Sequence, residues 1–502
     1  MSIATAITNA QGKVANAYTA ISNKGGTLPV TQNLSNMPTA IDSIPTGADR
    51  FRTVNASGQL IPPENDDLDL SDVTSIPDYS MYYIFRNASY PKNVDLSNLV
   101  SVSQYGMSNS FYGAGITRID LTDLAVADTR AFDSAFRDTP LATIIGLDKL
   151  KTVGSYGFSY AFYNCPLTAI PSLERLETVA TYGFQYAFAM QQTATNSIEI
   201  GCTSANSNSF ASAFTQSTIG DIVFTRLETA TGSSCFYNML NLATNCFKYR
   251  IAHMFPKLRR ISGGSAFRTA FRYCRFHKFI FDSLEDVAVQ ATGNNIFDSA
   301  FEYGLFSNNG YISGNLGGVY FPVLKTIGTT STSLYGMMYA ICRGSNATAT
   351  LDFPELTTAY NTSSTNTRGC FTECGAVWIY MPKLTNFGTY SQYCFYNSTA
   401  TREIHFGKEN QATIQAMSGY SSKFGATNAT IYFDLINHIT VGGVVYDRYG
   451  NDYDYDNEYY SWKNGNNVIY TKNEWTPAVG DTVYTKSDDT YVASADLITA
   501  VS

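Results

Sequence analysis

Histidine, tryptophan and charged residues are scarce in this chain of 502 residues. It holds 4 His and 3 Trp, and only 15% of its residues are Asp, Glu, Lys or Arg. The histidines form no HxH or HExxH pair, and the sequence contains neither a GxxxxGK[ST] loop nor a strand–GxGxxG–helix unit. The common signatures of metalloenzymes and of nucleotide-binding enzymes are therefore missing. We expect no catalytic residues, no cofactor and no metal, and so a protein that is not an enzyme.

Long apolar runs and an excess of positive charge are missing as well. No stretch approaches the roughly 18 consecutive apolar residues of a membrane span. The first residues, MSIATAITNAQGKVANAYTAISNKGG, lack the basic start and apolar run of a secretory signal. The formal net charge of −8 would repel a phosphate backbone, which argues against nucleic acid as a partner.

The cysteines show no metal-binding or disulfide pattern. The chain has nine, which is an odd number, and no CxxC pair occurs. The closest two, Cys370 and Cys374, have no neighbouring histidine. This pattern favours buried small hydrophobic residues and folding in a reducing cytoplasm, with a zinc site or a disulfide framework as the alternative.

What the chain does contain is an internal repeat. LKTVGSYGFSYAF (150–162) returns as LETVATYGFQYAF (176–188), so nine identical residues recur 26 positions later. The last aromatic of this block can be followed along the chain with steps of 24 to 40 residues. Its positions are Phe85, Phe111, Phe136, Phe162, Phe188, Phe214, Leu240, Phe271, Phe301, Ile341, Phe371 and Phe395. About twelve copies of roughly 26 residues predict a solenoid, whose longer steps are loop insertions.

Each copy combines two local patterns. Blocks such as FDSAF (132–136) and FSYAF (158–162) place two Phe four residues apart, which predicts one helical turn with both rings on one face. A short apolar or alternating run follows and predicts a β-strand. These runs are ITRIDL (116–121), DIVF (221–224), KFIF (278–281), GVYF (318–321), VWIYM (377–381) and EIHF (403–406). One copy cannot bury its Phe alone, so stacked copies must share a continuous core and a parallel sheet.

The copy LKTVGSYGFSYAFYNCPLTAIPSL (150–173) resembles the BspA-type leucine-rich repeat. Cys165 stands at the usual cysteine of that repeat, Leu167 and Ile170 at its strand positions, and Pro171 at its turn. The resemblance extends over roughly residues 66–435. It implies a leucine-rich-repeat solenoid of short parallel strands, and a surface or virion protein that binds without catalysis.

The N-terminal segment carries a second resemblance. ISNKGGTLPVTQNLSNMPTAIDSIPTG (21–47) is similar to a leader on tail and fibre proteins of phages from gut bacteria. Apolar residues of 3–21, among them Val14 and Tyr18, fall near one helical face, and 34–44 form a second short face. We expect residues 1–47 to be a helical anchor, which either attaches to other virion proteins or caps the first repeat.

After residue 435 the repeat fades, and the strand-like runs VIYTKNEW (468–475) and DTVYTKSDDTYVAS (481–494) predict a small all-β module. The expected division is an anchor at 1–47, a linker at 48–65, the solenoid at 66–435 and the β module at 436–502. The candidate ligand-binding residues form an aromatic cluster, which is either an exposed platform or the buried face of a hairpin. They are Tyr453, Tyr455, Tyr459, Tyr460 and Trp462.

Alternating Asp452, Asp454 and Asp456 invite comparison with a calcium loop. The comparison fails because Asn457 stands where such a loop needs Gly, and Lys463 where it needs Glu. His277 and His405 lie on or beside predicted strands, where a packed or surface residue is expected. Asp67 and Asp69 fit a turn-rich, acidic entry to the first repeat.

These features favour a phage virion structural protein, a tail or head fibre or decoration, that recognises a glycan or protein of the host surface without catalysis. Such a protein would be made in the host cytoplasm and act outside it. A fibre can be a homo-oligomer such as a trimer, although no heptad repeat predicts one. The alternatives are a bacterial cell-surface adhesin and a glycan-degrading enzyme with two carboxylates not evident from the sequence.

Overall fold

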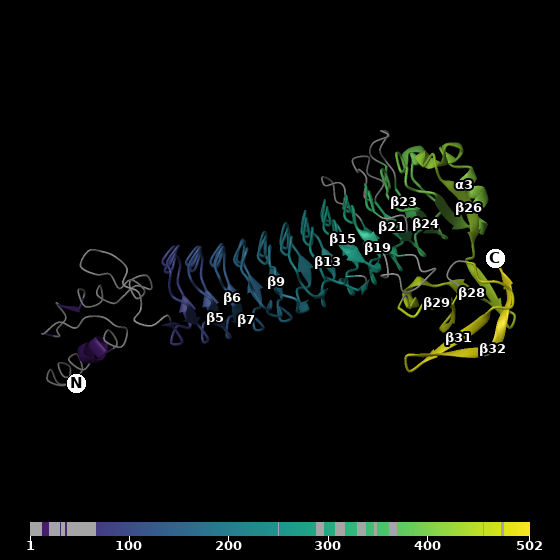
Figure 1. Ribbon diagram of the computed structural model, residues 1–502. Helices are drawn as coiled ribbons and strands as arrows, with labels where there is room; N and C mark the ends of the chain where they lie inside the picture. Colours follow the sequence, from purple (N-terminus) through teal and green to yellow (C-terminus); the bar gives the residue numbers. More distant parts are fainter. Residues whose placement is uncertain are drawn as a thin grey trace, which may run out of the picture.

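The computed structural model describes residues 13–19, 31, 36–37, 67–248, 250–287, 296–306, 317–328, 338–345, 349–360, 369–454, 456–472 and 476–502. From residue 67 onward the chain winds into a solenoid of about 13 turns, and a small barrel follows it (Figure 1). Of the predicted anchor, residues 13–19 are helical, and Tyr18 is buried against Val14 and Met37. Apart from residues 31 and 36–37, the rest of 1–47 and the linker 48–65 lie outside the described residues.

Parallel strands stack along one side of the solenoid, one from nearly every turn, in sheets of four, two and seven strands; at residues 168–173 only Leu173 forms an isolated bridge. They are β1 (Asp67–Asp69), β3 (Asn93–Asp95), β5 (Arg118–Leu121), β7 (Thr143–Gly146), β10 (Ile198–Ile200), β12 (Ile222–Phe224), β14 (Ile251–Ala252), β17 (Lys278–Ile280), β20 (Gly318–Tyr320), β22 (Thr350–Asp352), β24 (Trp378–Met381), β25 (Glu403–Gly407) and β26 (Thr430–Leu435). All six apolar runs that the sequence marked as strands lie in this series, at β5, β12, β17, β20, β24 and β25.

A second series of two-residue strands follows the leucine of each turn, in sheets of five and six strands. It holds β2 (Ser75–Ile76), β4 (Ser101–Val102), β6 (Val126–Ala127), β8 (Thr152–Val153), β9 (Thr178–Val179), β11 (Ser204–Ala205), β13 (Thr229–Ala230), β15 (Arg260–Ile261), β18 (Asp286–Val287), β21 (Thr326–Ile327) and β23 (Thr358–Ala359). A further pair, β16 (Arg275–Phe276) and β19 (Leu305–Phe306), joins two turns elsewhere on the coil.

The predicted helical turn in each repeat is wrong. In the block FDSAF, Ser134 has a left-handed φ of 54°, and Arg130 and Asp138 four residues away on either side have φ of 54° and 56°. The N–H groups of Phe132, Ser134 and Phe136 donate to carbonyls of the next turn at 2.8–2.9 Å. Residues between them bond within the turn, as Ala135 does to the carbonyl of Phe132 at 3.0 Å. We call this segment of each repeat the turn ribbon.

In the turn ribbon, as in a helix, side chains four residues apart point to the same face. Two Phe spaced by four therefore fit both structures. The Phe rings of the turn ribbon point inward and stack on those of the neighbouring turns. Phe162 lies between Phe136 and Phe188, with ring centroids 5.4 Å and 5.3 Å away. All twelve followed positions from Phe85 to Phe395 are buried, so the predicted core role of this ladder is confirmed.

Helices are few and short among the described residues. Apart from residues 13–19, they gather near the end of the solenoid: η2 (Ser391–Tyr393), η3 (Lys408–Asn410), α3 (Gln411–Gln415) and η4 (Tyr420–Gly425), with η5 (Gly450–Asp452) in the following module. Beyond β26 the chain forms a closed antiparallel barrel. Its strands are β27 (His438–Val441), β28 (Val444–Arg448), β29 (Tyr460–Asn464), β30 (Asn467–Thr471), β31 (Thr482–Ser487) and β32 (Thr490–Val501).

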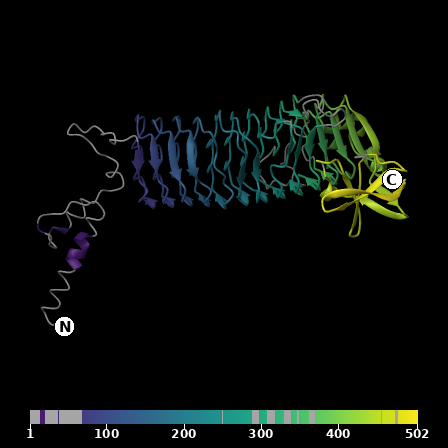
Figure 2. The ribbon, with the colours of Figure 1, turned by 60° about the horizontal axis from the view of Figure 1, so that its bottom comes forward.

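The barrel folds back beside the last turns of the solenoid rather than extending the rod (Figures 1 and 2). Strands that contact the barrel are buried on both faces, whereas strands of earlier turns are buried on one face only. Residues of β5 alternate between buried and half-buried, whereas all three residues of β17, and likewise of β20, are buried. On β17 and β20 the outward face is covered, because Ile280 and Tyr320 pack against Tyr460 of the barrel.

Candidate functional site

Two side chains of the predicted aromatic cluster at 453–462 are buried, one in the barrel core and one in the contact between the barrel and the solenoid. Trp462 is fully buried in the barrel core, and its Nε1 donates to Thr471 Oγ1 at 3.0 Å. Tyr460 is only 3% exposed, against the solenoid strands. Trp462 and Tyr460 therefore cannot belong to an exposed platform.

The other members of the cluster differ from one another. Tyr453 is half-buried, and its hydroxyl accepts a hydrogen bond from Arg448 Nη1 at 3.1 Å. Burial raises the pKa of Tyr453, so its hydroxyl stays neutral. Tyr459 is half-buried and stacks on Tyr491, with ring centroids 3.7 Å apart. Tyr455 lies outside the described residues.

Charged groups join the barrel to the solenoid around this cluster. His253, on the solenoid, lies between two aspartates. Its Nδ1 is 2.5 Å from Oδ1 of Asp282 in the solenoid, and its Nε2 is 3.2 Å from Oδ1 of Asp456 in the barrel module. Burial alone would lower the pKa of His253, but hydrogen bonds and charge from both aspartates outweigh it and raise the pKa to about 10. Lys278 pairs with Glu458 at 3.7 Å. The contact is therefore held by cations of the solenoid and carboxylates of the barrel.

A second set of contacts lies nearer the end of the solenoid. Lys383 Nζ contacts Glu355 at 2.9 Å and donates to the carbonyl of Arg448 at 2.7 Å. The backbone N–H of Gly450 donates to Glu355 Oε1 at 3.0 Å. A Cβ at Gly450 would lie 2.0 Å from the carbonyl oxygen of Pro322, so only glycine permits this approach.

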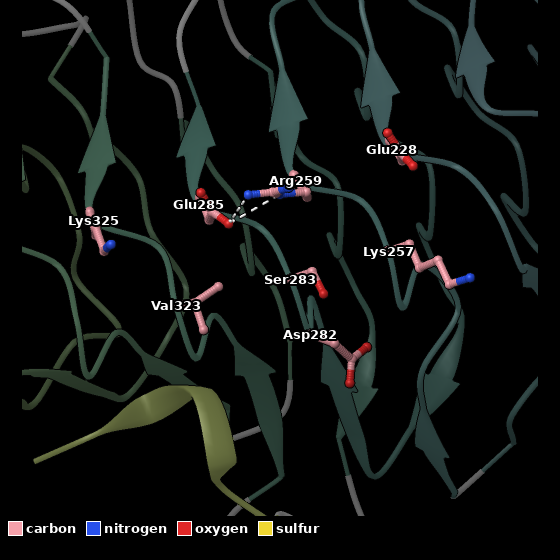
Figure 3. A pocket seen from close by; sticks show the side chains of 8 residues that line it. All are labelled: Glu228, Lys257, Arg259, Asp282, Ser283, Glu285, Val323 and Lys325. Carbon is pink, nitrogen blue, oxygen red and sulfur yellow. Dashed lines mark hydrogen bonds and ion pairs between the residues drawn. The ribbon is translucent and has the colours of Figure 1, made fainter. Parts of the chain in front are cut away.

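A charged groove of about 370 Å³ lies on the solenoid near the barrel (Figure 3). Glu228, Arg259, Glu285 and Lys325 stand in a row along its rim, one from each of four neighbouring turns (Figure 3). Arg259 pairs with Glu285 at 2.8 Å, and Lys257 and Asp282 add one charge of each sign. Because neighbouring turns alternate in sign, the row presents no net charge to a ligand, and its exposed ion pair adds at most about 1 kcal/mol to the stacking of turns.

A different surface, on the first half of the solenoid, gathers aromatic and cationic side chains that are exposed or half-buried. We call it the tyrosine–arginine face. Many of its tyrosines occupy the left-handed positions of the turn ribbon, from which side chains point away from the Phe core. Its members are Tyr79, Tyr82, Tyr83, Arg86, Tyr105, Tyr112, Arg130, Arg137, Tyr156, Tyr160, Tyr163, Tyr182 and Tyr186.

Stacking fixes these rings in register with the solenoid. The rings of Tyr156 and Tyr182 are 4.6 Å apart, and those of Tyr160 and its equivalent Tyr186 are 4.7 Å apart. The first tyrosine of the row, Tyr79, remains 52% exposed. Burial raises the pKa of Tyr160, so its hydroxyl remains a neutral donor and acceptor at physiological pH.

Arginines lie between these tyrosines. The Arg86 guanidinium is 5.0 Å from the ring centroids of both Tyr83 and Tyr112. Arg137 lies 5.0 Å from the rings of Tyr160 and Tyr163. Tyr and Arg are, together with Trp, enriched at the energetic centres of protein interfaces. The face can therefore supply hydrogen bonds, cation–π contacts and apolar area to a macromolecular partner.

The sequence contained a signal for this face. The two aligned blocks share Tyr156 with Tyr182 and Tyr160 with Tyr186, at the 26-residue spacing. A helical interpretation of the block gave no reason to place these tyrosines together on the surface. The left-handed φ at every fourth residue is what puts them there.

In the described part of the chain, no three His, Cys, Asp or Glu side chains are grouped as a metal site requires. Asp454 instead accepts hydrogen bonds from Asn457 and Tyr491, and Asp456 faces His253. All nine cysteines are buried and free, which confirms their expected role as small hydrophobic residues. Burial raises the pKa of Cys165 to about 12.

The remaining predicted polar residues also have structural surroundings. His405 stacks between Tyr380 and Tyr432 and contacts Asp434 at 2.9 Å, while burial lowers the pKa of His277. Asp67 and Asp69 lie on β1, where Asp69 accepts hydrogen bonds from Ser71. Among the helices that the structure describes, none has the length and apolarity to cross a membrane.

Comparison with known proteins identifies the repeat. The family model described as BspA type leucine rich repeat region matches in six copies, over residues 70–186, 129–254 and 349–433. A solved leucine-rich repeat protein from Bacteroides ovatus is similar, with 13% identity and a TM-score of 0.30, over 73% of this chain and 91% of that protein. No curated protein matches. Since the family model spans more than half of its residues, the chain belongs to the family of proteins with a BspA-type leucine-rich repeat region.

Proposed function

We propose that this protein is a non-catalytic recognition protein, displayed on a surface, that binds a partner through the tyrosine–arginine face. The stacked tyrosines with interleaved arginines, exposed at the first turns and half-buried further along, are the observation that supports this function. The Phe ladders beneath hold the turns in fixed register, so the face needs little ordering when it binds.

The tyrosine–arginine face is tested by substitutions that leave the Phe core intact. We expect a variant with Tyr83→Ala, Arg86→Gln and Tyr160→Ala to lose most of its binding to host or target cells. A matched control, Tyr396→Ala with Tyr432→Ala, removes tyrosines of comparable exposure, 37% and 38%, on later turns. Binding is measured as saturable association of labelled protein with cells. Equal binding by both variants would contradict the role of the face.

The surface that carries the protein, a phage particle or a bacterial cell, is a separate part of the proposal. The similarity of residues 21–47 to phage leaders supports a virion protein, a tail or head fibre or decoration, attached to other virion proteins through residues 1–47. A bacterial cell-surface adhesin is the second candidate, and membership of the BspA-type family favours it.

Mass spectrometry of purified phage particles separates the two settings. Presence of the protein in particles, and its loss when residues 1–47 are deleted, is expected for a virion protein. Absence from particles combined with antibody labelling of intact bacteria would favour the adhesin. Release of sugars from the bound surface would contradict a non-catalytic role in either setting.

A further inference from the structure

A pocket of about 510 Å³ lies on the second half of the solenoid, between the loop 242–248 and the next two turns. Tyr273, Arg275 and Tyr303 form its other side. We propose that this pocket, which we call the tyrosine pocket, binds a saccharide unit that carries a carboxylate. The proposal rests on the proposed recognition function and adds the chemical class of one ligand. The volume falls within the roughly 300–1,000 Å³ of small-molecule sites.

The aromatic side of the pocket is exposed and held in place. Tyr273 and Tyr303 are 41% and 43% exposed, and their rings stack with centroids 5.0 Å apart. Arg272 lies 4.9 Å and 5.4 Å from the two ring centroids and is itself paired with Glu302 at 2.8 Å. A Cβ at Gly344 would lie 2.5 Å from the Tyr303 ring, so this ring rests closely on the next turn.

The opposite side is a loop with a fixed conformation. The N–H of Thr244 donates to the carbonyl of Ser217 at 2.9 Å, and the N–H of Phe247 donates to Asp221 Oδ1 at 2.8 Å. Asn245 and Phe247 both have a left-handed φ, 74° and 45°. Because these contacts already order the loop, a ligand loses little free energy in organising it.

The charge of the lining selects the sign of the ligand. Lys248 and Arg275 line the pocket and are exposed, and the lining residues that the structure describes include Thr244 and Asn245 but no Asp or Glu. The charged groove of Figure 3, in contrast, is lined by three carboxylates and three cations. In a chain of net charge −8, a pocket whose described lining carries two cations and no acid favours an anionic ligand.

The combination of groups then points to a sugar. Arg and Lys bind a carboxylate, and the hydroxyl and amide of Thr244 and Asn245 can bond sugar hydroxyls. The tyrosines and the 43% exposed Leu242 offer apolar contact to the C–H groups of a sugar ring. A simple inorganic anion would use the cations alone and leave this aromatic side uncovered.

The test is a titration of the full chain with trimers of D-glucuronate, D-galacturonate and D-mannuronate, and with N-acetylneuraminate, each at up to millimolar concentration. The neutral counterparts are trimers of glucose, galactose and mannose, and inorganic phosphate tests for anion binding alone. We expect saturable binding of at least one acidic sugar, and binding about tenfold or more weaker for its neutral counterpart. Saturation by none of them, or equal affinity for phosphate, would overturn the proposal.

Variants locate the binding. Arg275→Gln and Tyr273→Ala are exposed changes, and each should weaken the affinity for the acidic sugar about tenfold. Tyr396→Ala, at a 37% exposed tyrosine outside both surfaces, is the matched control and should bind the sugar as the parent protein does. Circular dichroism and thermal unfolding verify that each variant is folded. Unchanged sugar affinity in folded pocket variants would place the binding elsewhere.

Failure of this proposal can be told apart from failure of the proposed function. If the parent protein binds cells but no acidic sugar, the tyrosine pocket is not a saccharide site and surface recognition stands. If it binds acidic sugar but no cells, the pocket is supported and the recognition role of the tyrosine–arginine face is contradicted.

Discussion

At the scale of single residues, the same position in successive turns forms a column, and each column has one role. The Phe columns fill the core, where Phe162 contacts Phe136 and Phe188 at near-parallel angles of 3° and 14°. The tyrosine columns stay outside at the left-handed positions. A substitution therefore acts on two interfaces at once, with the preceding turn and with the following one.

The Phe column makes a direct stability prediction. Phe162→Ala removes a fully buried ring and should lower the free energy of unfolding by about 3–5 kcal/mol, from lost burial and the cavity left behind. Tyr79→Ala, at a position 52% exposed, should cost less than about 1 kcal/mol. Urea unfolding followed by circular dichroism measures both. Similar midpoints for the two variants would contradict the core role of the column.

The cysteines make a second prediction at this scale. Burial raises the pKa values of Cys165 and Cys274 to about 12, so neither forms a thiolate at pH 8. The native protein should therefore not react with a thiol reagent, whereas the protein unfolded in urea should react at nine sites. Ser487→Cys, at an exposed barrel position, is the positive control for reagent access. Fewer than nine reactive thiols after unfolding would indicate a disulfide or a bound metal.

At the scale of elements, the strands could be predicted from the sequence and the turn ribbon could not. Alternating runs such as ITRIDL (116–121) bury every second residue in β5, as the pattern indicates. The two Phe of FDSAF are buried as expected, but spacing by four fits a helix and the turn ribbon equally well. Nothing in local sequence marks Ser134 or Tyr160 as left-handed, since the hydrogen bonds that hold them go to the next turn.

The turn ribbon can be distinguished from a helix at Ser134, which has φ of 54°. In a helix, Gly would be less stable there than Val. In the turn ribbon, Ser134→Gly should be neutral or stabilising, and Ser134→Val should destabilise by about 1–2 kcal/mol because a β-branched side chain opposes the left-handed conformation. Thermal unfolding of the two variants gives the order. Greater stability of the Val variant would restore the helical interpretation.

At the scale of the whole molecule, the barrel covers the strand face of the later turns. The sequence identified an all-β module but could not place it, because the contact joins residues far apart in the chain, such as His253 and Asp456. For the same reason the aromatic residues at 453–462 could not be assigned to an exposed or a buried face from their spacing. Only the docked arrangement shows that Tyr460 faces Ile280 and Tyr320.

The His253 contact predicts a pH-dependent contact between the two parts. Its pKa rises from an ordinary 6.5 to about 10, so the contribution of the charged histidine is complete below pH 6.5 and is lost as the pH rises towards 10. The protection of the barrel segment 456–460 against hydrogen exchange, expressed relative to the intrinsic exchange rate at each pH, should therefore fall over this range. Asp282 and Asp456 pair with the histidine, and Asp452, Asp454 and Lys486 lie around it. His253→Gln should remove the pH dependence, whereas His405→Gln, within the solenoid, should retain it.

Removal of the barrel tests whether covering the strand face is its structural role. A chain ending at residue 436 would expose Ile280 and Tyr320, which are now 1% and 2% exposed, beside the half-buried Ile251. Exposed apolar area of this kind promotes association, so we expect the truncated protein to bind a hydrophobic dye and to self-associate in sedimentation experiments. Adding Ile280→Thr and Tyr320→Thr to the truncated chain should reduce both effects, because it makes the uncovered face polar. A truncated chain that stays monomeric and binds no dye would contradict this role, because the strand face would then be stable without a cover. The charged contacts at His253 and Lys278 would then be the main link between the barrel and the solenoid.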